Sequence, residues 1–423
     1  MSTKAHASTS GRLPGRRVVW GAVALATLVA AGYYGLVWLP GQIEEEALEA
    51  NRQGDLLRVQ GQMDAALPHY QRAVEIKPDF ALAWGNLAMV HAALERFAEA
   101  REPFENALKL EPDLFEARIG LAVTLDGLGE FLAAEQNYQE AIRLRPAFAE
   151  IHYNLGYLYQ QQGLYADAVS QYRQAVGLKP DFLQALANLG LVHDLQHNPG
   201  EAIRTYNRAL EVNPDEGPLY VRLGKSHMKL SAHEAAREVY RRALELGMER
   251  AQVYHDLGVI SETGGQLEAA RSYYHQALLK DPDHAESYHR LGSVTEALGQ
   301  QEQAVAYFEE ATRRDPEHTG AHYALAQLYL RKGNFEEGQR LMEVFTRLKE
   351  YEGRLQGRRR AVEQNPRDPR AAYELALLHL EFGRVTKADE VLQRVLRLDP
   401  GFAPALQKLE EIESFRDTAG ESS

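Results

Sequence analysis

The 423-residue chain contains no cysteine. This absence excludes disulfides, zinc–thiolate sites, iron–sulfur clusters, thioether-linked haem and a lipidated N-terminal cysteine. It indicates no compartment, because oxidising and reducing spaces both tolerate a cysteine-free chain. The sequence also lacks the motifs GxxxxGK[ST], HExxH and GxSxG and an EF-hand loop. We therefore expect no cofactor, no metal site and no catalytic residue, and we do not expect an enzyme.

Positive charge is scarce outside the N-terminus. The chain has a net charge of -13. Its first 17 residues hold Lys4, Arg12, Arg16 and Arg17 and no acid, which leaves -17 for the remainder. A body of that charge repels a phosphate backbone, so nucleic acid is not expected as a partner.

An uncharged apolar segment follows the basic N-terminus. Residues 18–39 are free of charge, and at 1.5 Å per helical residue they span about 33 Å, the thickness of a hydrocarbon core. A cleaved signal peptide, the alternative, has an apolar stretch of only about 7 to 15 residues. We predict a transmembrane signal anchor at 18–40. Cations before the span and acids after it place residues 1–17 in the cytoplasm and the body in the periplasm of a bacterium, which predicts a single-pass inner (cell) membrane protein.

Prolines recur every 34 residues along the rest of the chain. They are Pro78, Pro112, Pro146, Pro180, Pro214, Pro282 and Pro316. In the same register an alanine recurs at Ala66, Ala100, Ala134, Ala168, Ala202, Ala236, Ala270 and Ala304, and an aromatic residue follows four positions later. The first half of each unit pairs leucine with a small residue, as in Leu155-Gly156, on an apolar face with helical spacing. Each unit is therefore two helices that cross where Gly or Ala lets the backbones approach.

This 34-residue pattern resembles the tetratricopeptide repeat in its small residue, leucine, aromatic, alanine and proline. The resemblance implies an all-α fold, a right-handed α-solenoid of about ten helix pairs, here preceded by the transmembrane helix. Nine consecutive units are predicted at 41–352, an extended helix at 353–368, a tenth unit at 369–400, a capping helix at 401–416 and a flexible tail at 417–423.

Two features depart from the pattern. Pro68 and Pro103 fall inside second helices, and because an interior proline costs about 3 kcal/mol, we expect those helices to bend or start late. After Asn334 an apolar seam with a spacing of seven replaces the expected boundary. This seam either packs on the adjoining repeats or forms a short coiled coil with another chain.

The resemblance also implies a concave groove, lined by the first helices, that binds extended peptides or partner helices. By position the groove residues are Asn86, Met89, Ile119, Val123, Tyr153, Asn154, Tyr157, Asn188, Leu191, Val221, His255, Val259, His289 and Tyr323. The asparagines resemble a ladder that grips an extended peptide backbone, and the aromatic residues favour an amphipathic helix.

The sequence thus predicts a membrane-anchored scaffold that binds proteins or peptides and assembles an envelope complex. Small residues in the anchor, at Ala22, Ala26 and Ala30, would allow self-association. The alternatives are an accessory subunit that presents substrate to a separate enzyme and a cytoplasm-facing regulatory adaptor. The sequence does not name the partner.

Overall fold

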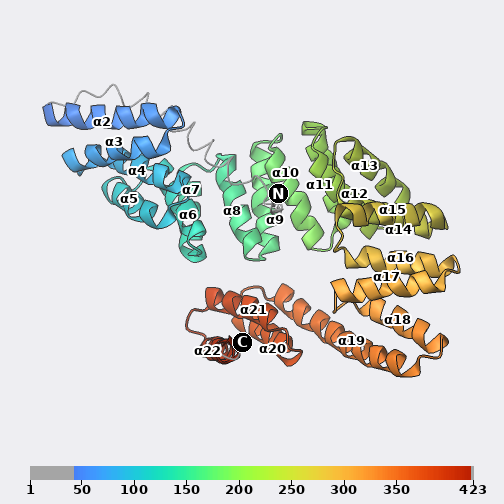
Figure 1. The fold of residues 1–423 in the computed structure, drawn as a ribbon. Coiled ribbons are helices and arrows are strands. Elements are labelled where there is room, and N and C mark those ends of the chain that lie inside the picture. The colour runs from blue at the N-terminus through green and yellow to red at the C-terminus, as the bar shows by residue number, and fades with distance from the viewer. Residues whose placement is uncertain (1–41, 421–423) are drawn as a thin grey trace, which may run out of the picture. The chain divides into compact units, whose positions relative to one another are not determined.

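The computed structural model describes residues 42–420, and this part of the chain consists of helices and short turns without strands (Figure 1). The first compact unit ends at Val192 and the second begins at His193. Within each unit the consecutive helices pair as antiparallel first and second helices of a repeat, and each pair packs on the next. The helices are α2 (Gln42–Val59), α3 (Met63–Ile76), α4 (Ala81–Ala93), α5 (Phe97–Leu110), α6 (Phe115–Gly127), α7 (Phe131–Leu144), α8 (Ala149–Gln161), α9 (Tyr165–Leu178), α10 (Leu183–Leu195), α11 (Pro199–Val212), α12 (Gly217–Lys229), α13 (His233–Glu245), α14 (Ala251–Thr263), α15 (Leu267–Lys280), α16 (Ala285–Ala297), α17 (Gln301–Arg314), α18 (Thr319–Arg331), α19 (Phe335–Gln364), α20 (Pro369–Glu381), α21 (Val385–Leu398) and α22 (Ala403–Gly420).

The predicted membrane anchor at 18–40 lies outside the described residues. Among the helices from α2 to α22, none combines the length and the apolar character needed to cross a bilayer.

The two helices of a repeat meet at a glycine and an aromatic ring. A Cβ atom added to Gly156 on α8 would lie 2.9 Å from the ring of Tyr172 on α9. At Gly292 on α16 it would lie 2.7 Å from the ring of Phe308 on α17. Both rings are fully buried. The prediction that small residues mark the helix crossings is confirmed at these two glycines, because a Cβ atom at either would lie closer to the ring than van der Waals contact allows.

The turn within each pair requires a left-handed backbone. Gly129 and Gly163 adopt φ of 79° and 74° between their paired helices. The same position is filled by Glu95, His197 and Ser231 in other repeats, with φ between 54° and 58°. Glycine adopts this region without steric cost, whereas the other three residues do not.

The interior prolines do not delay their helices. Helices α3 and α5 contain Pro68 and Pro103, yet both have the same 14-residue length and begin in the same 34-residue register as α7 and α9. The expectation of a late start is therefore wrong. Packing of the flanking alanines and aromatic residues outweighs the single missing hydrogen bond.

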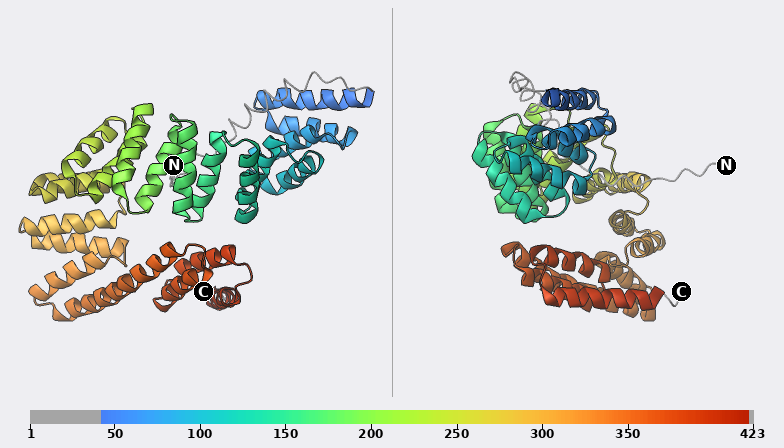
Figure 2. Two further views of the ribbon diagram at one scale, coloured as in Figure 1. Left: turned by 180° about the vertical axis from the view of Figure 1, so that it is seen from behind. Right: turned by 90° about the vertical axis from the view of Figure 1, so that its left-hand side faces the viewer.

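The second unit contains one helix of 30 residues, α19, where the repeat period slips (Figure 2). Three residues of its seam, Leu341, Tyr351 and Val362, are buried within the chain, as expected if the seam packs on adjoining repeats. Across this region Glu317, just before α18, forms ion pairs with Arg384 at 2.9 Å and with Lys387 at 2.8 Å. At the C-terminal end, α22 continues to Gly420, so residues 417–420 of the predicted flexible tail are helical.

Candidate functional site

The predicted groove residues differ sharply in exposure. Eight are buried, five are half-buried and one is exposed. The buried residues are Asn86, Met89, Ile119, Tyr153, Asn154, Asn188, Val221 and His255; the half-buried residues are Val123, Tyr157, Leu191, Val259 and His289; Tyr323 is 45% exposed. The half-buried residues and Tyr323 are the most accessible to a ligand, whereas most of the buried side chains contribute to packing between the repeats.

Two of the three asparagines of the expected ladder bond within the chain. The Asn86 Nδ2 donates to Asn51 Oδ1 over 3.0 Å, and the Asn188 Nδ2 donates to Tyr153 OH over 3.3 Å. Each bond joins first helices of adjacent repeats. Both amides therefore have a hydrogen-bond partner inside the first unit, and a buried amide without one would cost about 1 to 3 kcal/mol.

Tyr153 is part of the same internal network. Its ring lies 5.8 Å from that of Tyr172 and 5.1 Å from that of Phe182. Burial raises the pKa of Tyr153 to about 12, so its hydroxyl stays neutral. Tyr157, one turn further along α8, is only half-buried and remains available to a partner.

In the second unit the predicted residues also join the core. Val221 belongs to the cluster around Tyr240, and Val259 packs against the cluster around Tyr274. The exposed Tyr323 contacts Phe345 of α19, with ring centroids 5.0 Å apart. An aromatic surface is thus present at Tyr323.

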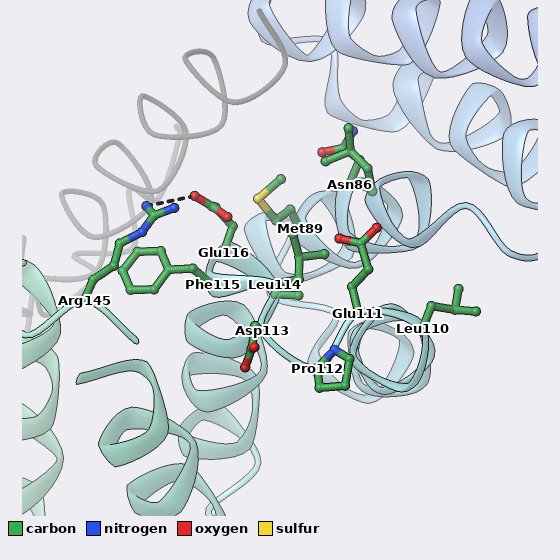
Figure 3. A pocket seen from close by; sticks show the side chains of 13 residues that line it. Asn86, Met89, Leu110, Glu111, Pro112, Asp113, Leu114, Phe115, Glu116 and Arg145 are labelled. Carbon is green, nitrogen blue, oxygen red and sulfur yellow. Dashed lines mark hydrogen bonds and ion pairs between the residues drawn. The ribbon is translucent and has the colours of Figure 1, made fainter. Parts of the chain in front are cut away.

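A cavity of about 440 Å³ lies in the first unit, between α4, the turn before α6 and the start of α6 (Figure 3). Two predicted groove residues, Asn86 and Met89, line it. Its apolar wall is completed by Leu82, Leu110 and Leu114. This volume is sufficient for one or two side chains of a bound peptide.

The rim of the cavity carries more acid than base. Glu111, Asp113 and Glu116 line it with a single cation, Arg145. Arg145 Nη1 lies 3.2 Å from Glu116 Oε1, and its guanidinium lies 3.9 Å from the centroid of the Phe115 ring. Both contacts are visible at one side of the cavity in Figure 3. The cation of the rim is therefore already paired.

Glu111 interrupts a rule that the neighbouring repeats obey. The position before the repeated proline is a cation in three repeats, and each cation forms an ion pair with an acid of the preceding first helix. The pairs are Lys77 with Glu44 at 3.0 Å, Arg145 with Glu116 at 3.2 Å and Lys179 with Glu150 at 3.3 Å.

In the second repeat both members of this pair are replaced. Glu111 occupies the place of the cation, and Leu82, 34 residues before Glu116, occupies the place of the acid. Glu111 is exposed and forms no ion pair within residues 42–420. In the second repeat a cavity therefore lies where the other three repeats have an ion pair. The carboxylate of Glu111 lies at its edge without a cationic partner among the described residues.

The sequence interpretation found only part of this site. It assigned Asn86 and Met89 by their register but considered first helices alone, and so omitted Glu111 and Arg145 in the turns. The missed signal was present in the sequence, because Glu111 reverses the charge seen at Lys77 and Arg145 in the same register.

The antiparallel helix pairs, each packed on the next, define a helical repeat protein. Models of the tetratricopeptide repeat match residues 51–115, 127–163, 148–215, 188–251, 249–317, 296–346 and 359–401. These matches together cover more than half of the chain, which therefore belongs to the tetratricopeptide repeat family. Proteins of this fold serve in protein–protein interaction.

Solved structures resemble parts of the chain, and one of them gives the same fold with a TM-score above 0.5. The C-terminal part of a tetratricopeptide repeat protein from Cytophaga hutchinsonii is 13% identical, with a TM-score of 0.51 over 57% of this chain and 98% of that chain. YrrB, described as a TPR protein with an unusual peptide-binding site, is 24% identical, with a TM-score of 0.39 over 44% of this chain and 96% of that chain. PilF of Pseudomonas aeruginosa is 22% identical, with a TM-score of 0.41 over 48% of this chain and 92% of that chain. None of the curated proteins compared matches the chain.

Proposed function

We propose that this protein is a membrane-anchored scaffold that binds peptide segments of partner proteins along its first helices and so assembles a complex in the cell envelope. The observation that carries the binding role is the cavity beside Met89 with the unpaired Glu111 at its rim. In three other repeats the corresponding place holds an ion pair, whereas in the second repeat it stays open to a ligand.

The cavity selects a particular side chain. Its wall of Leu82, Met89 and Leu114 suits an aliphatic stem, and Glu111 suits a cationic end. A lysine side chain combines both properties, because it buries its methylene groups and keeps its ammonium group at the edge. The expected ligand is thus an extended segment with lysine at the residue that enters the cavity.

Peptide binding by the detergent-solubilised full chain tests this function. In an array of extended peptides, sequences with lysine at one fixed position should bind at least tenfold more tightly than their glutamate counterparts. Glu111→Gln should remove that preference, and Glu102→Gln, an exposed acid on α5, should retain it. Equal binding of both peptide classes by the unmodified chain would refute the assignment.

The membrane anchor and the placement of the repeats rest on residues 1–40. The charge difference across residues 18–39 supports a cytoplasmic N-terminus and periplasmic repeats. A reporter that is active only outside the cytoplasm, fused after Ser423, should be active. Activity of a cytoplasm-dependent reporter at that place would instead favour the regulatory adaptor. Deletion of residues 1–41 should release a folded helical body from the membrane fraction.

A further inference from the structure

Two successive repeat interfaces of the second unit each contain a pair of histidine rings in tilted contact. His255 and His284 have ring centroids 5.1 Å apart, and His289 and His318 have centroids 4.7 Å apart. The second pair lies 34 residues after the first in both members. The two interfaces therefore place identical rings at equivalent positions of α14, α16 and α18.

At the first interface the ring nitrogens are satisfied by a hydroxyl. Ser287 Oγ lies 3.0 Å from His255 Nδ1 and 2.9 Å from His284 Nδ1. Gln252 occupies the repeat position that Glu286 holds in the next repeat, and its amide donates to Asp256 Oδ1 over 2.7 Å. This interface is a closed hydrogen-bond network.

At the second interface both of these residues change. Ala321 replaces the serine, and Glu286 replaces the glutamine, at the same repeat positions. His318 Nε2 lies 2.8 Å from Glu286 Oε2. His289 Nδ1 is buried without a hydrogen-bond partner in the described part of the chain, and it lies 3.8 Å from Glu286 Oε1. The substitution of serine by alanine thus creates an unsatisfied nitrogen beside a carboxylate.

These three side chains offer converging ligand atoms. One nitrogen of each histidine and one oxygen of Glu286 all lie within 4.8 Å of one another. Around a tetrahedral zinc ion, ligand atoms at about 2.0 to 2.2 Å from the metal are about 3.3 to 3.6 Å apart, so small side-chain movements suffice. Glu286 is 43% exposed and gives an ion access from solvent.

We propose that Glu286, His289 and His318 bind one divalent transition-metal ion of the zinc type, and that this ion bridges the eighth and ninth repeats. Two imidazole nitrogens and one carboxylate oxygen suit such an ion, and the remaining coordination positions are open to water or to a partner's side chain. Glu286 and His289 come from α16, and His318 caps α18. The ion would therefore fasten two repeats that otherwise meet through side-chain packing.

The structure also sets limits on the affinity. His318 Nδ1 accepts a hydrogen bond from Ala321 N over 3.1 Å, so the ring proton sits on Nε2 and points to Glu286. A metal at Nε2 displaces that proton and weakens the helix cap. Arg290 Nε, 3.1 Å from Glu286 Oε1, competes for the carboxylate. We expect binding weaker than that of a four-ligand structural zinc site.

The test titrates metal-free full-length protein, purified in detergent without a histidine tag, with Co²⁺ and then with Zn²⁺. One equivalent of Co²⁺ should produce visible absorption bands, and Zn²⁺ should abolish them. Glu286→Gln, which reproduces the residue found at Gln252, and His289→Gln should each weaken binding at least tenfold. His255→Gln, the equivalent change at the first interface, should leave binding unchanged. Circular dichroism should be recorded for every variant.

Two results would overturn the proposal. The first is the absence of stoichiometric Co²⁺ or Zn²⁺ binding by the unmodified protein, which does not depend on any variant. The second is equal binding by the unmodified protein and a folded Glu286→Gln variant, which would place the ion elsewhere.

Discussion

The second and third repeats bury an aromatic ring at the same position, but they carry opposite charges in the turn that leads to the next repeat. Their second helices bury an aromatic residue at the same position, Phe104 on α5 and Tyr138 on α7, each at most 1% exposed. The turn before the next repeat holds Glu111 in one case and Arg145 in the other. Glu111 leaves one side of the cavity without an ion pair, whereas Arg145 and Glu116 form one at its other side. Packing thus repeats with the period, and the proposed binding site lies where the period of the charges is broken.

The largest effect should be common to both repeats. Phe104→Ala and Tyr138→Ala should each lower the free energy of unfolding by about 3 to 5 kcal/mol, because both rings fill the crossing of a helix pair. Urea unfolding followed by circular dichroism measures the loss. If only one of the two variants is destabilised by more than about 1 kcal/mol, the frameworks are not equivalent.

Exchange of the charged residues around the cavity should change its affinity for lysine peptides in opposite directions. Leu82→Glu with Glu111→Arg rebuilds the ion pair in the second repeat and should weaken binding of lysine peptides at least tenfold, about 1.4 kcal/mol. Glu116→Leu with Arg145→Glu should remove the ion pair from the other side of the same cavity, add a carboxylate to its rim and strengthen binding of lysine peptides. Fluorescence anisotropy with a labelled peptide reports both affinities. Unchanged affinity in both double variants would show that this position does not control binding.

The turns offer a smaller contrast. Glu95 has φ of 58° in the second repeat, and Gly129 has φ of 79° at the same place in the third. Glu95→Gly should stabilise the protein by about 0.5 to 1 kcal/mol, and Gly129→Ala should destabilise it by about 1 kcal/mol or more, because only glycine adopts this backbone without strain. Thermal unfolding measures both shifts, and a change of the same sign in both variants would contradict the explanation.

Acid should weaken the second repeat slightly more than the third. Burial lowers the pKa of His91 on α4, whereas Leu125 occupies this position on α6. Below about pH 6.5 the unfolded chain binds a proton that the folded chain resists, so this contribution to stability is lost as the pH falls through that range. Hydrogen exchange at pH 7 and pH 5 should show reduced protection of α4 relative to α6, and His91→Leu should remove the difference. Equal changes in α4 and α6 of the unmodified protein would contradict this assignment.

The fold could be predicted because each packing position is repeated many times. A small residue and an aromatic ring meet at most helix crossings, as at Gly156 and Tyr172, and a single period reveals them. Exposure could not be predicted in the same way. Asn188 lies on the helix expected to line the groove, but its amide is buried against Tyr153, because the angle between neighbouring repeats decides what reaches solvent.

The candidate sites depend on combinations of residues that the period does not repeat. The roles proposed for Glu111 and Glu286 depend on residues that lie near them in the fold. These are Leu82 for Glu111 and His318 for Glu286. Their partners lie about 30 residues away, so spacing within a single helix does not reveal the pair. Comparison of the same register across repeats is the one sequence signal that identifies both.

The ion pairs of Glu317 have a consequence for the end of the second unit. Lys387 lies 70 residues further along the chain, and Arg384 beside it stacks 3.5 Å over the ring of Tyr351. Closing a loop of that length restricts the chain, and here the restriction rests on charges of which Glu317 and Lys387 are partly exposed. Raised salt screens exposed charges, whereas the buried rings of the repeats are indifferent to it. The attachment of the tenth repeat should consequently respond in part to ionic strength.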